Sequence, residues 1–183
     1  MTATTSARAG RGTLMVFFSR AGENYWNGGR RTLTRGNTDR LASIIGDRIS
    51  CDTWRIEAAD PYSDRYDPTV RRNVNEQQQD ARPVIAGQLP NLASYDTVLL
   101  GSPIWNVRPP MIMSTFLEGV DLAGVRLLPF VTYAVSGAGS TSSVYRPLTN
   151  AAAAVEDPLA VRGEEVDDAS ADVDRWLGRN NLR

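Results

Sequence analysis

Leu14-Met-Val-Phe-Phe18 decides the fold, because this run of five apolar residues stands uninterrupted between Thr13 and Ser19. A strand covered on both faces has such a pattern, whereas a strand with one solvated face alternates between apolar and polar residues. The run is too short for a signal-peptide core or a membrane span. We therefore predict a buried strand of a parallel sheet at this position.

Further strands follow along the chain, and a helical pattern separates each from the next. The predicted strands cover residues 14–18, 53–57, 97–100, 126–133 and 159–161, and the predicted helices cover residues 37–49, 67–82, 110–117, 142–153 and 166–177. The polar, Gln-rich helix 67–82 is interpreted as a solvated one. This alternation is typical of a doubly wound α/β domain with helices on both faces. We expect one such domain over residues 14–183, after a flexible lead-in at residues 1–13.

The composition excludes several kinds of chemistry. The chain has no histidine and no lysine, and its 20 basic and 21 acidic residues give a formal net charge of −1. A Ser-His-Asp triad, a His-ligated metal, a Walker A loop and a Schiff-base lysine are therefore excluded. The balanced charge gives no general attraction to nucleic acid. With one cysteine, Cys51, and no membrane-length segment, we expect a cytoplasmic protein that depends on a cofactor for demanding chemistry.

Candidate binding residues follow the predicted strands, because ligands of open parallel sheets bind beyond the carboxyl ends of the strands. The first strand leads to Ser19 and Arg20, and then to Gly36-Asn-Thr38 at the start of a helix. Backbone amides and hydroxyls at a helix amino terminus suit a phosphate, and Arg20 or Arg35 could add a positive charge. The alternative is an ordinary capped helix.

Two more strand ends carry residues that suit a flat ring. Ser102-Pro-Ile-Trp-Asn106 follows the third strand, and its indole could stack on a heterocycle. The alternative for Trp105 is a core side chain that closes the end of the sheet. Thr132 to Ser140 ends the fourth strand, and its glycines allow close approach to a ligand or form a plain loop.

These segments together resemble the flavodoxin family, in its branch with an insertion in the phosphate loop. The resemblance rests on residues 17–25, Arg35-Gly-Asn-Thr38, 95–97, Leu100-Gly-Ser-Pro-Ile-Trp-Asn106, 115–118 and Ser136-Gly-Ala-Gly-Ser140. It implies a five-stranded parallel sheet of order 2-1-3-4-5 and non-covalent FMN. The implied cofactor residues are Ser19, Arg20, Gly36, Asn37, Thr38, Ser102, Pro103, Ile104, Trp105, Asn106, Thr132, Ser136, Gly137 and Gly139.

Two features depart from the family pattern. Residues 21–35 separate Ser19 from Gly36, where the family usually has a compact loop, and this insertion could form a flap near the site or remain disordered. Relatives of this branch often carry a histidine after the fourth strand, where this chain has Thr132-Tyr-Ala-Val135. A proton-relay role at that position is therefore in doubt.

The resemblance favours an FMN-binding electron carrier that serves transient protein redox partners, a reductase and an acceptor. The alternative is an NAD(P)H-dependent FMN oxidoreductase that acts on a quinone or similar acceptor, which requires an open face of the ring. A non-redox phosphate-binding protein on the same fold is the third class. The balanced charge does not suggest the charged docking surface of many carriers.

Overall fold

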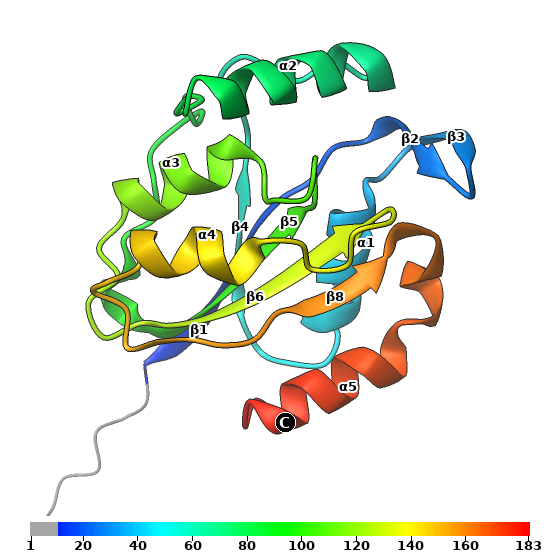
Figure 1. Ribbon diagram of the computed structural model, residues 1–183. Coiled ribbons are helices and arrows are strands. Elements are labelled where there is room, and N and C mark those ends of the chain that lie inside the picture. The colour runs from blue at the N-terminus through cyan, green and yellow to red at the C-terminus, as the bar shows by residue number, and fades with distance from the viewer. Residues whose placement is uncertain (1–10) are drawn as a thin grey trace, which may run out of the picture.

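The computed structural model describes residues 11–183, and most of the predicted lead-in falls outside the described residues. A parallel sheet forms its centre (Figure 1). Its strands are β1 (Gly12–Phe18), β4 (Asp52–Ile56), β5 (Tyr95–Pro103), β6 (Arg126–Tyr133), β7 (Ala154–Val155) and β8 (Leu159–Arg162). They lie in the order β4-β1-β5-β6, with β7 and β8 both beside β6. Counted along the chain, this is the predicted 2-1-3-4-5 order.

The fifth position of the sheet is divided into two short strands, where one strand was expected. β7 pairs with Arg126 and Leu127, and β8 pairs with β6 from Phe130 onward. Pro158 lies in the gap and has no N–H to donate to β6. The backbone nitrogen of Pro129 in β6 points toward the same gap. Leu127, two residues earlier, accepts a backbone hydrogen bond from that side, and the backbone groups of residues two apart on a strand point the same way. A proline on each strand therefore accounts for the break.

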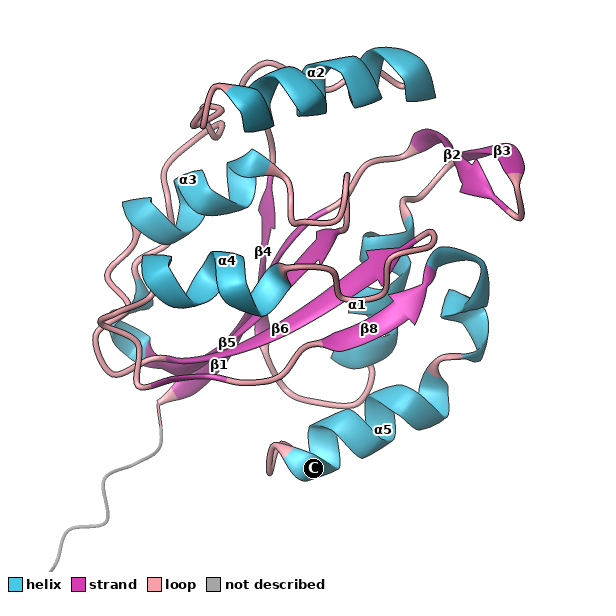
Figure 2. Cartoon of the chain, in the orientation of Figure 1, coloured by secondary structure: helices cyan, strands magenta, loops and turns pink. Residues whose placement is uncertain are grey.

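Helices cover the two faces of the sheet (Figures 1 and 2). α1 (Asn37–Gly46) and α5 (Ser170–Arg179) lie on one face, and α3 (Met111–Gly119) and α4 (Thr141–Leu148) lie on the other. α2 (Tyr66–Gln78) lies on the side of α3, and the short 3-10 helices are η1 (Leu92–Ser94) and η2 (Gly163–Asp168). No helix in residues 11–183 has the length and hydropathy needed to cross a bilayer.

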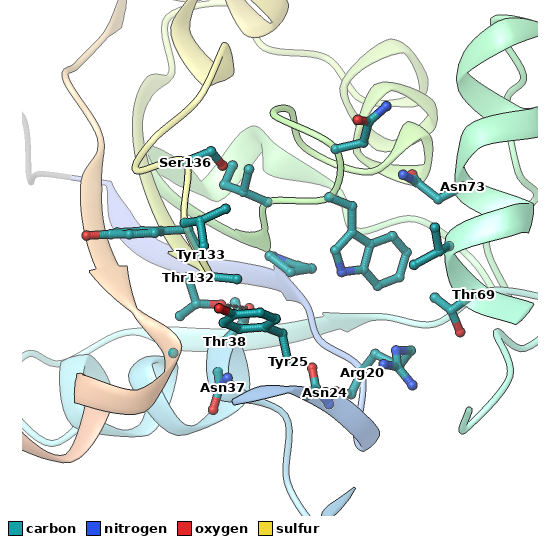
Figure 3. Close-up of a pocket in the computed structure, with 18 of the residues that line it drawn as sticks. Arg20, Asn24, Tyr25, Asn37, Thr38, Thr69, Asn73, Thr132, Tyr133 and Ser136 are labelled. Carbon is teal, nitrogen blue, oxygen red and sulfur yellow. Dashed lines mark hydrogen bonds between the residues drawn. The ribbon is translucent and has the colours of Figure 1, made fainter. Parts of the chain in front are cut away.

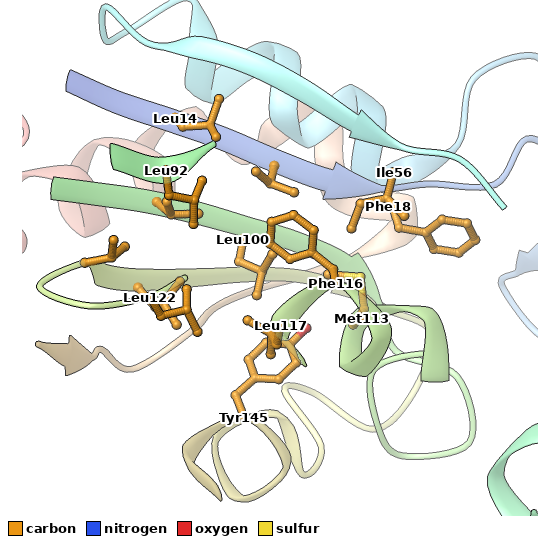
Figure 4. Packing of buried hydrophobic residues seen from close by; sticks show 14 of the residues in the cluster. Leu14, Phe18, Ile56, Leu92, Leu100, Met113, Phe116, Leu117, Leu122 and Tyr145 are labelled. Atoms are coloured by element: carbon orange, nitrogen blue, oxygen red, sulfur yellow. The ribbon is translucent and has the colours of Figure 1, made fainter. Parts of the chain in front are cut away.

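The apolar sequence of β1 follows from its position in the sheet, between two core clusters. Leu14, Val16 and Phe18 pack into the core beneath α3 and α4, part of which Figure 4 shows. Met15 and Phe17 point to the other face and pack with residues of α1 and α5. Because both faces of the strand are buried, every position from residue 14 to residue 18 is apolar.

Several helix limits differ from the prediction. α1 ends at Gly46 and α4 ends at Leu148, because residues 149–153 turn toward β7 instead of continuing the helix. The predicted final helix 166–177 is divided between η2 and α5. Its predicted inner face is nevertheless buried, as Val166, Ala169, Val173, Trp176 and Leu177 are each at most 2% exposed.

Candidate functional site

A cavity of about 400 Å³ opens at the carboxyl ends of β1, β5 and β6 (Figure 3). Its size is that of an ordinary small-molecule pocket. Residues from all three predicted strand-end segments line it, although these segments are far apart in the sequence. The predicted residues among them are Ser19, Arg20, Asn37, Thr38, Pro103, Ile104, Trp105, Asn106, Thr132 and Ser136.

Four predicted residues do not line the cavity but lie behind or beside it. Gly36 precedes α1, where a Cβ would stand 2.2 Å from Ser19 Oγ, so only glycine fits there. Ser102 is fully buried and its hydroxyl faces that of Tyr145 at 3.5 Å. Gly137 and Gly139 have φ of +60° and +52° and shape the loop after β6.

The amino terminus of α1 forms one corner of the cavity, which we call the phosphate corner (Ser19, Gly36, Asn37, Thr38, Thr132). Ser19 Oγ accepts a hydrogen bond from Asp39 N at 3.1 Å, and the hydroxyls of Thr38 and Thr132 bond at 2.7 Å. The backbone amides of Asn37 and Thr38 donate to no acceptor in residues 11–183. Unpaired amides at a helix amino terminus attract anions.

The charged groups near this corner are already paired. Asp39 accepts hydrogen bonds from Arg35 at 2.5 Å and from Arg55 at 2.7 Å. Burial raises the pKa of Asp39, but these two arginines outweigh burial and hold the pKa below its ordinary value. The Asp39 carboxylate therefore stays ionised, and the two arginines balance its charge. Arg35 is directed to Asp39 and not to the cavity.

Arg20 lines the cavity, but its guanidinium donates hydrogen bonds to backbone carbonyl oxygens. It donates to the carbonyl oxygens of Ala21 and Ser63 at 3.1 and 3.0 Å, and also to that of Glu23. Burial lowers the pKa of Arg20, against the raising influence of Asp64 and Glu23. Both terminal nitrogens hold backbone carbonyls, and Nε is buried without a partner in residues 11–183.

A tight turn presents Trp105 to the cavity. Trp105 N donates to Arg108 O at 2.9 Å, and the two central residues have positive φ, +50° for Asn106 and +71° for Val107. Positive φ is unusual for a β-branched residue, so this turn needs outside support. Gln77 supplies part of it, donating to Trp105 O at 3.0 Å and accepting from Asn106 Nδ2 at 2.8 Å.

Trp105 packs against core aromatic side chains and also borders the cavity, so its stacking on a ligand ring stays a prediction. Its ring packs edge-on against Phe18 and Tyr62, with centroids 5.5 and 5.1 Å away. It is only partly buried, and it also lines the cavity. Behind it, burial and a hydrogen bond to Glu76 raise the pKa of Tyr62, so this phenol stays neutral.

The loop after β6 supports the same turn from the other side. Ser140 donates to Val107 O through its backbone N–H at 2.8 Å and through its hydroxyl at 3.1 Å. A Cβ on Gly139 would stand 2.1 Å from that same oxygen. The glycine therefore allows the two loops to approach closely.

α2 forms a wall of the cavity that the sequence analysis missed. Tyr66, Thr69, Val70, Asn73 and Val74 line the cavity, and they recur at helical spacing. Thr69 and Asn73 are 5% and 3% exposed, so the interpretation of this helix as a solvated one is wrong. The spacing was visible, but a polar inner face resembles a solvent face in a sequence.

The insertion at residues 21–35 is folded. β2 (Gly22–Trp26) and β3 (Gly29–Leu33) form an antiparallel hairpin, from which Asn24 and Tyr25 line the cavity. Glu23 accepts a hydrogen bond from Tyr66 N at 2.9 Å, at the start of α2. At the tip, Asn27 N donates to Glu164 Oε1 at 2.7 Å. The hairpin therefore spans from α2 to η2 beside the phosphate corner.

A parallel sheet of this order, with a ligand-sized cavity at its carboxyl edge, defines the class of doubly wound α/β binding proteins. The family model for flavodoxin matches residues 31–176. The chain therefore belongs to the flavodoxin family.

Solved structures share the fold. A protein from Bacteroides uniformis assigned as a flavoprotein is 24% identical with a TM-score of 0.74, over 93% of this chain and 99% of its own. A flavoprotein from Lactobacillus acidophilus in complex with FMN is 18% identical with a TM-score of 0.62, over 91% and 98%. An NADH:FMN oxidoreductase in its apo form is 14% identical with a TM-score of 0.54, over 94% and 90%. A search of curated proteins found no match.

Proposed function

We propose that this protein binds FMN non-covalently in the cavity and carries electrons between protein redox partners. One observation carries the proposal: three strand-end segments meet around the amino terminus of α1, where two backbone amides have no acceptor in the described residues. Family membership and the FMN-bound relative from Lactobacillus acidophilus support the choice of cofactor.

The phosphate corner fits the phosphate group of FMN. Ser19, Asn37 and Thr38 would hold it through hydroxyl, side-chain amide and backbone donors. Asn37 Nδ2 donates no hydrogen bond within residues 11–183, so it adds a free neutral donor. Such donors together with the helix dipole stabilise an anion without a paired cation.

The remaining walls fit a flat heterocycle. Pro103 and Trp105 would flank the isoalloxazine ring with Asn106 nearby. Thr132 and Ser136 would lie along its other side, and Gly137 would shape the loop that carries Ser136. When bound, FMN supplies one- and two-electron transfer, and the residues of this chain orient the ring and limit its contact with water. The apolar side chains around it disfavour added negative charge on a poorly solvated ring.

The rim of the cavity favours the carrier role. Of the large hydrophobic side chains exposed in residues 11–183, Val70, Val107 and Val135 all line the cavity, and Val84 does not. An apolar rim lets a partner protein approach the cofactor without desolvating charges. This arrangement suits the chain's lack of a large net charge.

Purification tests the proposal. The protein should be yellow and release about one FMN per chain, and the apoprotein should regain the flavin spectrum when FMN is added. A colourless preparation that takes up no FMN would refute the site. Mixing the loaded protein with NADPH in a stopped-flow instrument separates the roles: a carrier keeps its colour without a reductase, whereas rapid bleaching favours the NAD(P)H oxidoreductase.

Substitutions in α1 locate the phosphate. Thr38→Glu should weaken FMN strongly through charge repulsion, and Ser43→Glu, on the exposed face of the same helix, should not. Because Thr38 is buried, Thr38→Val provides a second variant that keeps the shape and removes only the hydroxyl. Unchanged affinity in both Thr38 variants would remove this residue from the phosphate site.

A further inference from the structure

The wall that α2 adds to the cavity lies outside the three strand-end segments assigned to the cofactor. Tyr66, Thr69, Val70, Asn73 and Val74 form this wall, which we call the α2 wall. Figure 3 shows Thr69 and Asn73 projecting from α2 toward the interior of the cavity. The wall combines polar groups with two valines, as expected where a ligand is both packed and oriented.

Asn73 has a side-chain donor that borders the cavity and has no partner in the described residues. The residue is 3% exposed, and its Oδ1 accepts a hydrogen bond from Gln77 Nε2 at 3.4 Å. Its Nδ2 group donates to no acceptor in residues 11–183. This amide is therefore available to donate a hydrogen bond to a ligand oxygen in the cavity, and the packed side chain around it is already ordered.

The charges around the α2 wall argue against an anionic ligand. Arg20 is the guanidinium that lines the cavity in the described part of the chain. Both its terminal nitrogens donate to backbone carbonyls, its Nε is buried without a partner, and the acidic groups of Asp64 and Glu23 lie near enough to offset its charge. At the amino terminus of α2, the Glu23 carboxylate accepts from Tyr66 N at 2.9 Å and places a negative charge there. A pyrophosphate on this side of the cavity would therefore find the terminal nitrogens of Arg20 already bonded to backbone carbonyls and would meet the Glu23 carboxylate at the start of α2.

We propose that the α2 wall is a binding subsite for a neutral, planar molecule whose carbonyl oxygen accepts a hydrogen bond from Asn73 Nδ2. Val70 and Val74 supply the apolar contact, and the exposed Val70, Val107 and Val135 line the entrance. The inference rests on the proposed function, because the same cavity would hold FMN. It also predicts that pyridine dinucleotides bind poorly inside this cavity.

Titration calorimetry with menadione, a neutral naphthoquinone, tests the subsite on the oxidised, FMN-loaded protein. Menadione should bind, and Asn73→Ala should weaken it by roughly threefold to tenfold, the value of one hydrogen bond. Asn75→Ala is the matched control, because Asn75 is exposed on the same helix and bonds only to Gln79. Its affinity for menadione should equal that of the wild type.

A charged probe tests the electrostatic part of the inference. Naphthoquinone-2-sulfonate has the same ring system with one negative charge, and it should bind at least tenfold more weakly than menadione. NADP⁺ should show no binding that competes with menadione. Equal affinity of the two quinones, equal effects of Asn73→Ala and Asn75→Ala, or no menadione binding would each overturn the subsite. A protein that takes up no FMN would instead show this in its spectrum before any titration, and the proposed function would fail with the subsite.

Discussion

Replacing Gly139 by alanine tests whether the loop after β6 holds the Trp105 turn in place. The new Cβ would stand 2.1 Å from Val107 O, a backbone atom that cannot rotate away. Any shift of this oxygen weakens its hydrogen bonds from the N–H and hydroxyl of Ser140, at 2.8 and 3.1 Å. The substitution therefore acts on the turn that presents Trp105.

The expected cost has two parts. Alanine in the left-handed region costs about 1 kcal/mol, and the loss of two hydrogen bonds adds about 2 kcal/mol. Gly124→Ala is the matched control, because Gly124 has φ of +73° and no heavy atom within 4 Å of its Cβ position. It should therefore lose only about 1 kcal/mol of unfolding free energy.

Urea denaturation of the two variants measures the difference, which should be about 2 kcal/mol. Fluorescence titration with FMN then measures the consequence for the cavity. If FMN binding must restore the turn, Gly139→Ala should weaken FMN by up to about 30-fold, and Gly124→Ala should leave the affinity unchanged. Equal unfolding free energies for the two variants would show that the close approach of Gly139 to Val107 does not stabilise the turn.

Two further substitutions test other supports of the site. Gln77→Ala removes both hydrogen bonds from α2 to the Trp105 turn and should lower the unfolding free energy by about 1–2 kcal/mol, whereas Gln78→Ala, exposed on the same helix, should change it by less than about 0.5 kcal/mol. Equal losses in urea denaturation would contradict this role. Asp39→Asn should reduce the loss of unfolding free energy at acidic pH. The lowered pKa of Asp39 contributes stability above the unfolded pKa of about 3.9, and this contribution disappears as the pH falls through the folded pKa. Urea denaturation between about pH 5 and pH 2 measures the slope, and an Asp39→Asn slope as steep as that of the wild type would refute the role of Asp39.

The sheet could be predicted because the two patterns that indicate it, an apolar run and the alternation of strands with helices, can both be seen in the sequence. The apolar run at residues 14–18 reflects burial on two faces, and the helices between the strands impose parallel pairing. The topology then placed the segments that begin at Ser19, Ser102 and Thr132 at one edge. Most candidate residues line one cavity for this reason, although no motif alone was specific.

The turn at Trp105 could not be predicted from its residues. Turns with two central residues of positive φ favour Asn-Gly, whereas this chain has Asn106-Val107. The preference is overridden by distant contacts, from Gln77 on one side and Ser140 on the other. Such support depends on tertiary structure, which the local sequence does not encode.

The α2 wall was missed because its polar residues resemble a solvent face, and because the association of α2 with the hairpin is a tertiary contact that the sequence does not show. The exposed ion pair between Arg30 and Asp67, at 2.8 Å, contributes little to this association by itself. Arg20 contributes more, because its half-buried guanidinium joins the start of the hairpin to the Ser63 carbonyl that precedes α2. If Arg20 left that carbonyl to bind a phosphate, this connection would be lost. The contact that holds α2 over the cavity therefore supports the proposal that the phosphate corner would bind an anion through neutral donors.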